Sequence, residues 1–240
     1  MRVGVVQPGS AGRAGAAGQG PPAHQAGAGA SRPPHLAGQP RGSVGQVGRA
    51  YDAVAIAASA GGMAALSVVL GGLPGDFPAS IVIVQHLDPR HRSLMAEILG
   101  RRTVLEVREA REGDKLAPGS VHIAPPDRHL LINPDGTLSL TQSELVHFVR
   151  PSADLLFESL AASCRERAIA VVLTGTGSDG SMGVQAVKSV GGTVIAQDER
   201  SSEFFGMPAA AIDTGQVDFI LPLDEIAPAL VTLVTAGAGP

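Results

Sequence analysis

The stretch Asp52-Ala-Val-Ala-Ile-Ala-Ala-Ser59-Ala-Gly61-Gly62 is the feature around which the chain is organised. An apolar run ends at Ser59, two glycines follow, and Met63-Ala64-Ala65-Leu66 begins a helical pattern. A continuous apolar run predicts a strand buried on both faces of a parallel sheet. We therefore expect a strand at 52–58, a tight turn, and a helix at about 63–71.

Ser59 lies at this turn, where its hydroxyl would project from the edge of the sheet. The spacing Ala57-x-Ser59-x-Gly61 is a small-residue version of a strand–turn–helix motif that carries a nucleophilic serine. Small residues suit the turn because the strand and helix backbones pass close together, and the first N–H groups of the helix could hold an oxyanion. The alternative is that Ser59 only caps the helix, and on this stretch alone the cap is favoured.

The composition excludes several classes of protein. Hydrophobic residues make up 44% of the 240 residues, but aromatic residues only 3%, so the core must consist of Val, Ile, Leu and Ala. A net charge of -4 argues against nucleic acid as a partner, and a single Cys excludes an internal disulfide framework. No apolar run approaches the roughly 20 residues of a membrane span, and no secretory signal is evident. We expect a cytoplasmic protein that does not insert into membranes.

The composition changes abruptly near residue 50. Residues 1–49 are rich in Gly, Ala, Pro, Gln and Ser and cannot bury enough apolar surface to fold, so we expect a disordered tail. An over-early start codon would give the same pattern. Residues 50–236 form the expected domain, in which strands and helices alternate.

This alternation predicts an α/β fold with a doubly wound, mostly parallel sheet in a Rossmann-like three-layer sandwich. Between 112 and 142 the pattern changes, and the turn Asn133-Pro134-Asp135-Gly136 predicts an antiparallel hairpin near one edge of the sheet. Further strands are expected at 80–84, 103–107, 121–124, 129–132, 138–141, 168–173, 193–196 and 219–221, and helices at about 92–100, 152–166, 181–190, 207–213 and 224–234.

Three polar residues share one position in this pattern. Ser59, His86 and Asp179 each come shortly after a buried apolar strand. Ligand sites of open parallel sheets form outside the carboxyl ends of the strands, so the three side chains could converge. Their types match an acyl-transfer site, in which Ser59 attacks a carbonyl, His86 takes the hydroxyl proton, and Asp179 orients the imidazole.

Each member also has a simpler interpretation. His86 could be a loop histidine with one hydrogen bond, and Asp179 could serve the turn of its glycine-rich loop. The spacing Gly175-x-Gly177-x-x-Gly180, with Asp198-Glu199 about 20 residues further on, weakly matches a dinucleotide fingerprint and keeps a nucleotide-binding oxidoreductase as an alternative.

The remaining Cys and His residues suggest no further chemistry. Cys164 lies within an expected helix and is interpreted as structural. His122, His129 and His147 follow no metal-ligand spacing, so we assign no metal site.

Several motifs taken together resemble the catalytic domain of the chemotaxis protein-glutamate methylesterases, over about residues 52–234. They are Ala58-Ser59-Ala60-Gly61-Gly62, Gln85-His86, Leu116-Ala117-Pro118-Gly119-Ser120-Val121-His122-Ile123-Ala124-Pro125, Arg150-Pro151-Ser152-Ala153-Asp154, Leu173-Thr174-Gly175-Thr176-Gly177-Ser178-Asp179-Gly180, Ala196-Gln197-Asp198-Glu199 and Phe205-Gly206-Met207-Pro208.

The resemblance implies a doubly wound sheet and a Ser-His-Asp triad, which falls on Ser59, His86 and Asp179. It also implies oxyanion donors at the backbone N–H groups of Ala60 and Thr176, and no cofactor. The family hydrolyses methyl esters of glutamate side chains on chemoreceptors, releasing methanol, and some members deamidate glutamines. A methylated chemoreceptor-like protein is therefore the expected substrate.

The chain departs from the family at its N-terminus. Typical members carry a phospho-accepting receiver domain there, where this chain has a low-complexity tail. Constitutive activity, or control by a separate regulator, would follow. A catalytically silent binding module on the same fold remains the alternative from another class.

Overall fold

A computed structural model of the chain describes residues 52–86, 93–146 and 148–236. The chain divides into two units, Met1–Gly42 and Ser43–Pro240, and every described residue belongs to the second. The predicted tail of residues 1–49, residues 87–92 of the predicted loop and helix, and residue 147 lie outside the described residues.

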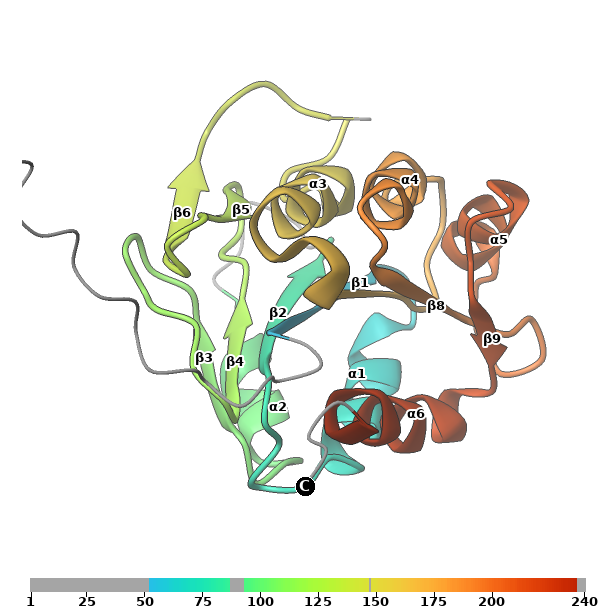
Figure 1. Cartoon of the computed structure of the whole chain (residues 1–240), viewed down its shortest axis with the longest axis horizontal. Helices are drawn as coiled ribbons and strands as arrows, with labels where there is room; N and C mark the ends of the chain where they lie inside the picture. Colours follow the sequence, from blue (N-terminus) through green and yellow to red (C-terminus); the bar gives the residue numbers. More distant parts are fainter. Residues whose placement is uncertain (1–51, 87–92, 147, 237–240) are drawn as a thin grey trace, which may run out of the picture. The chain divides into compact units, whose positions relative to one another are not determined.

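The second unit is built around a seven-stranded sheet in which all neighbouring strands are parallel (Figure 1). The strand order is β3-β4-β2-β1-β7-β8-β9. The strands are β1 (Ala53–Ala58), β2 (Ser80–Gln85), β3 (Glu106–Glu109), β4 (Ser120–Ile123), β7 (Ala168–Val172), β8 (Thr193–Gln197) and β9 (Phe219–Leu221). The central strands β1, β2 and β7 are buried along their whole length, as their largely apolar sequences predict.

Helices cover both faces of this sheet (Figure 1). One face carries α1 (Gly62–Gly71), α2 (Met95–Gly100) and α6 (Leu223–Ala236), and the other carries α3 (Ala153–Cys164), α4 (Ser181–Ser189) and α5 (Gly206–Asp213). A short 3-10 helix, Arg165–Arg167, continues from α3. The architecture is the doubly wound three-layer sandwich that the alternating pattern predicts.

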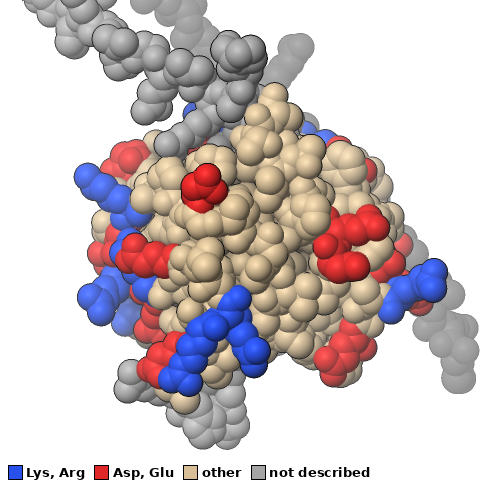
Figure 2. Space-filling view, turned by 90° about the horizontal axis from the view of Figure 1, so that it is seen from below, with Lys and Arg blue, Asp and Glu red and all other residues tan. Residues whose placement is uncertain are grey.

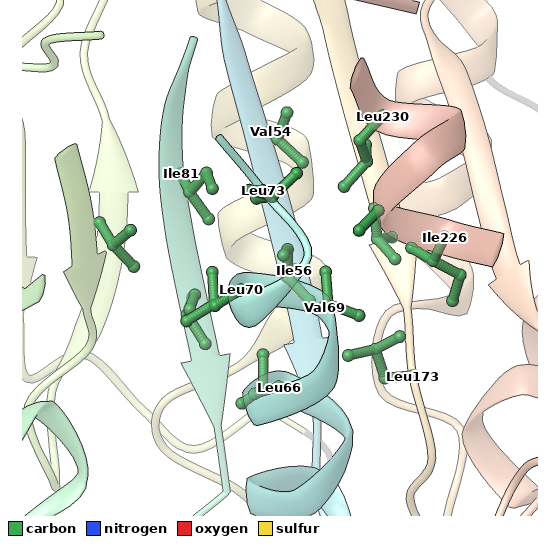
Figure 3. Packing of buried hydrophobic residues seen from close by; sticks show 14 of the residues in the cluster. Val54, Ile56, Leu66, Val69, Leu70, Leu73, Ile81, Leu173, Ile226 and Leu230 are labelled. Atoms are coloured by element: carbon green, nitrogen blue, oxygen red, sulfur yellow. The ribbon is translucent and has the colours of Figure 1, made fainter. Parts of the chain in front are cut away.

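The sheet separates two hydrophobic cores, and alternate residues of β1 enter each one. Val54 and Ile56 face α1 and α6, where they pack near Leu66 and Leu230 (Figure 3). The alanines at 53, 55 and 57 face the side of α3, together with Phe157. Larger side chains on one face and alanines on the other leave room for α3 against the sheet, and both faces hold β1 in place.

The antiparallel hairpin consists of β5 (His129–Ile132) and β6 (Leu138–Thr141), joined by the predicted turn. These strands form a separate two-stranded sheet, whereas β4 belongs to the parallel sheet. Ile132 attaches the hairpin to α3, because its N–H donates to Ser159 Oγ at 3.0 Å and its carbonyl accepts from Ser163 Oγ at 2.8 Å.

One strand begins later than its sequence predicts. The apolar segment from residue 103 suggests a strand, but β3 begins only at Glu106. Thr103 instead forms a turn, in which its Oγ1 donates to Leu70 O at 2.8 Å and accepts from Leu105 N–H at 3.3 Å. A threonine side chain that bonds nearby backbone competes with the ladder of a strand.

Charged side chains are unevenly distributed on the face that carries α1 and α6. Viewed from that side, Lys, Arg, Asp and Glu lie mainly towards the margins around an uncharged centre (Figure 2). Among the described residues, no helix has the length and apolar character needed to cross a bilayer.

Candidate active site

The site lies where the winding of the sheet reverses direction. β1 pairs with β2 on one side and with β7 on the other, so the carboxyl ends of these three strands meet at one edge. Ser59 follows β1, His86 follows β2, and Asp179 lies in the loop between β7 and α4. Such a switch point is where open α/β sheets bind ligands.

The Ser59 hydroxyl does not cap α1. The N-cap of this helix is Gly61, with φ of 76°, and no side chain among the described residues caps the helix. A left-handed residue is tolerated at this tight turn because glycine has no Cβ. The structure therefore disfavours the interpretation of Ser59 as a helix cap.

His86 and Asp179 meet across the sheet edge, as their predicted pairing requires. His86 Nε2 lies 2.8 Å from Asp179 Oδ2, and the two side chains are 14% and 4% exposed. Among the described residues, His86 Nδ1 has no hydrogen-bond partner. The described residues show no hydrogen bond from the Ser59 hydroxyl to the His86 ring, and such bonds often form only when substrate is present.

The Asp179 carboxylate lies at the N-terminus of α3. It accepts hydrogen bonds from Ser152 Oγ at 2.8 Å and from the N–H groups of Ala153 at 2.6 Å and Asp154 at 3.1 Å. Burial acts to raise the pKa of Asp179, but bonds from His86 and from these two N–H groups outweigh it and hold the pKa below its ordinary value. Asp179 is therefore an ionised hydrogen-bond partner of His86.

Asp154 makes the reciprocal contact. It belongs to α3, and its Oδ1 accepts from the N–H groups of Gly180 at 2.9 Å and Gly183 at 2.8 Å, at the N-terminus of α4. Asp179, just before α4, thus binds the start of α3, while Asp154 of α3 binds the start of α4. Sequence reasoning did not assign Asp154 a role; an acidic residue in a first helical turn was the available signal.

His129 contacts Ser152, one of the residues that bind the Asp179 carboxylate. It is fully buried on β5, where its Nδ1 accepts the Ser152 N–H at 3.1 Å and its Nε2 donates to Glu144 O at 3.0 Å. Burial is the largest cause that lowers the pKa of His129, which favours the neutral ring that this pattern requires. No sequence pattern predicts this role, because the contacts of His129 join segments that are far apart in the chain. No group of His, Cys, Asp and Glu among the described residues is arranged to hold a metal ion.

The glycine-rich loop passes very close to Ser59. A Cβ added to Gly175 would lie 2.8 Å from Ser59 Cβ and would overlap Met207 Sδ, so only glycine fits. The Gly175 carbonyl accepts the Met207 N–H at 2.9 Å. Because the peptide is planar and trans, the Thr176 N–H points away from this bond.

The nucleotide-binding alternative meets a physical objection, and Cys164 fits its structural interpretation. Asp198 Oδ1 accepts from both the N–H (3.0 Å) and the Oγ (2.5 Å) of Ser201, so this carboxylate stabilises its own turn instead of facing a ribose. Burial, with a smaller effect of Asp52, raises the pKa of Cys164 to about 11, which leaves a protonated, unreactive thiol.

Fold and site together define a doubly wound α/β domain with Ser59, His86 and Asp179 at the switch point of its sheet. Residues 54–230 match the family model described as CheB methylesterase, and the chain belongs to this family.

Individual relatives agree with this assignment. The chain is 46% identical over 192 residues to a protein-glutamate methylesterase/protein-glutamine glutaminase of Moorella thermoacetica, covering 78% of this chain and 45% of that protein. It is 39% identical to a putative protein of the same name from Leptospira interrogans, covering 76% of this chain and 95% of that protein. The crystal structure of the Thermotoga maritima CheB methylesterase catalytic domain matches with a TM-score of 0.74 and 39% identity, covering 77% of this chain and 99% of that one.

The chain spans about half the length of most curated relatives that it matches. Family membership thus concerns the catalytic domain that the Thermotoga structure represents.

Proposed function

We propose that this chain is a serine carboxylesterase that hydrolyses glutamate methyl esters on chemoreceptor-type proteins, with Ser59, His86 and Asp179 as its triad. The observation that carries the proposal is the 2.8 Å contact between His86 and Asp179. These residues follow β2 and β7, the two strands that flank β1, and Ser59 follows β1. Family membership supports the ester chemistry, and relatives named methylesterase/glutaminase extend the proposal to glutamine side-chain amides.

The proposed reaction proceeds in two steps, acylation of Ser59 and hydrolysis of the acyl-enzyme. Ser59 Oγ attacks the ester carbonyl while His86 Nδ1 takes the hydroxyl proton, and the tetrahedral oxyanion is held by the N–H groups of Ala60 and Thr176. The intermediate collapses, the C–O bond to the methoxy group breaks, and His86 returns the proton so that methanol leaves. Water then attacks the acyl-enzyme with His86 again as base, which releases the glutamate carboxylate and restores Ser59.

Asp179 stabilises the charged state of His86 in both steps. An ionised carboxylate at 2.8 Å favours the imidazolium that forms when Ser59 gives up its proton. Hydrogen bonds from His86 and from the N-terminus of α3 lower the pKa of this carboxyl and so keep it ionised.

Methanol release from a methylated chemoreceptor fragment tests the proposal. We expect Ser59→Ala to lower kcat by roughly four to six orders of magnitude, because triad members act as a unit. Ser67→Ala in α1 is the matched control, since within the described part of the chain Ser67 Oγ bonds only the Met63 carbonyl of its own helix. Unchanged methanol release by Ser59→Ala would show that Ser59 is not the nucleophile. No methanol release by the wild-type protein would favour a catalytically silent binding module.

A further inference from the structure

Gln85 connects the two segments that carry Ser59 and His86. It is the last residue of β2 and only 6% exposed. Its Nε2 donates to Ser59 O at 2.7 Å and to His86 O at 3.2 Å. Both partners are acceptors, so the amide nitrogen must face them and Oε1 must face away.

The Ser59 carbonyl is held from two sides. Besides the Gln85 amide, the N–H of Gly62 donates to it at 2.9 Å. The Ser59 carbonyl and the Ala60 N–H belong to one planar trans peptide, so they point in opposite directions. The donors on the carbonyl therefore determine where the Ala60 N–H points.

The two proposed oxyanion donors are thus oriented in related ways. The peptide of Thr176 is held by a backbone group, the Met207 N–H on the Gly175 carbonyl. The Ser59–Ala60 peptide is held by the Gly62 N–H and, in addition, by a side chain, the Gln85 amide, both of which donate to the Ser59 carbonyl. Ala60 is also held at its own carbonyl, which accepts from Thr174 Oγ1 at 3.1 Å.

The environment of the Gln85 side chain is more consistent with a role in orienting the Ser59–Ala60 peptide than with a role in stabilising the fold. Its Oε1 is buried and has no hydrogen-bond partner in the described part of the chain, an arrangement that costs free energy and calls for an explanation. A Cβ on Gly62 would overlap this oxygen and lie 3.0 Å from Gln85 Cδ, so the absence of a side chain at 62 leaves the space that Gln85 occupies.

We propose that Gln85 is a positioning residue that fixes the Ser59–Ala60 peptide and so aims the Ala60 N–H at the oxyanion. The inference rests on the proposed esterase function. Gln85 touches neither the substrate nor the reacting atoms; it acts through the peptide that follows the nucleophile.

The test is Gln85→Met, which keeps the length of the side chain but removes the amide donor. Loss of one oxyanion donor lowers kcat by about 10²–10³-fold; because Gly62 still holds the carbonyl, we expect a fall of about 10- to 100-fold. KM should change little, since the oxyanion forms only in the transition state. Ser80→Ala is the matched control: Ser80 is buried at the opposite end of β2, and its loss removes a hydrogen bond to Ser120 without reaching the site.

A second variant, Gly62→Ala, perturbs the contact of the Gln85 amide without changing Gln85 itself. Gly62→Ala keeps Gln85 but should displace its amide. Because the new Cβ would also lie 2.7 Å from Ala58 Cβ on the strand that leads to Ser59, we expect a fall in kcat at least as large as that of Gln85→Met. The double variant should be little worse than Gly62→Ala alone, because the contact of the Gln85 amide is already lost in that variant. Each variant is compared at matched folded fraction, measured by thermal melting, and Gly62→Ala remains informative should Gln85→Met fail to fold.

The outcomes separate the two proposals. Full activity of Gln85→Met beside an inactive Ser59→Ala would overturn the role of Gln85 and leave the esterase proposal standing. An active Ser59→Ala would overturn the esterase proposal itself. A fall in melting temperature equal to that of Ser80→Ala, with kcat unchanged, would assign Gln85 a purely structural role.

Discussion

Asp179 shows how one buried residue combines charge and position. Its carboxylate is 4% exposed, yet each oxygen has at least two donors, from His86, Ser152 and the first N–H groups of α3. These donors offset the cost of burying a charge. The same bonds fix the carboxylate geometrically, as the proposed role of Asp179 in orienting His86 requires.

Replacing Asp179 by Asn tests the orienting role. The amide keeps the shape but brings an NH2 group towards donors that need an acceptor, and it lacks the charge that stabilises His86 as imidazolium. We expect kcat to fall by about 10⁴-fold, less than for Ser59→Ala. Methanol release measured for both variants gives the comparison, and an Asp179→Asn enzyme as active as wild type would exclude Asp179 from the triad.

The lowered pKa of Asp179 also predicts a pH dependence of stability. A carboxyl whose folded pKa lies below its unfolded value of about 3.9 contributes stability that is complete above that value. This contribution is lost as the pH falls through the lower folded pKa. The wild-type protein should therefore unfold at a higher urea concentration than Asp179→Asn near neutral pH, and the difference should shrink below about pH 4. A difference that is constant down to acid pH would contradict the shifted carboxyl.

The sequence allowed prediction of which residues reach the site, but not of how they are held. Ser59, His86 and Asp179 follow buried strands, and this local pattern places them at one sheet edge. The supporting contacts of Gln85 and His129 join segments far apart in the chain. No periodicity or spacing in one sequence records such contacts.

At the level of elements, α3 and α4 meet at unusually close range. A Cβ on Gly183 would lie 2.5 Å from Phe157 Cβ and 3.0 Å from Asp154 O. This approach allows Asp154 to reach the N-terminus of α4, while Asp179, two residues before α4, reaches the start of α3. The packing of two helices is therefore part of the geometry of the site.

Gly183→Ala should separate these helices although alanine favours helix by about 1 kcal/mol over glycine. We expect a net loss of stability of roughly 1–3 kcal/mol from overpacking, together with a lower kcat as Asp179 shifts with α4. Urea unfolding and methanol release measure the two effects. Gln185→Ala, at an exposed position of the same helix, should change neither, and a Gly183→Ala variant with raised stability would contradict the tight packing.

Elements with continuous apolar runs or strong turn signals were predicted well. The hairpin strands at 129–132 and 138–141 have the expected bounds, because Asn133–Gly136 specifies the turn. Pairing was harder to predict: β4 lies next to the hairpin in sequence but joins the parallel sheet between β2 and β3. Neighbours in a sheet depend on long-range packing, which local patterns do not contain.

At the scale of the whole molecule, the described domain is anchored from its first residue. The Asp52 N–H donates to Arg167 O at 3.1 Å, and its carboxylate lies 2.6 Å from Arg167 Nε. β1 begins at the next residue and lies at the centre of the sheet. The fold of the domain therefore depends on the chain from Asp52 onward.

Deleting residues 1–49 should leave both the melting temperature and the rate of methanol release unchanged. These residues lie outside the described part of the chain, and their composition is too poor in apolar side chains to form a core. A longer deletion through Ala58 is the control, because it removes the central strand and should prevent folding. Faster methanol release after the short deletion would show that residues 1–49 restrain the enzyme, while a lower melting temperature would show that they pack against it; either result would contradict a tail without a role.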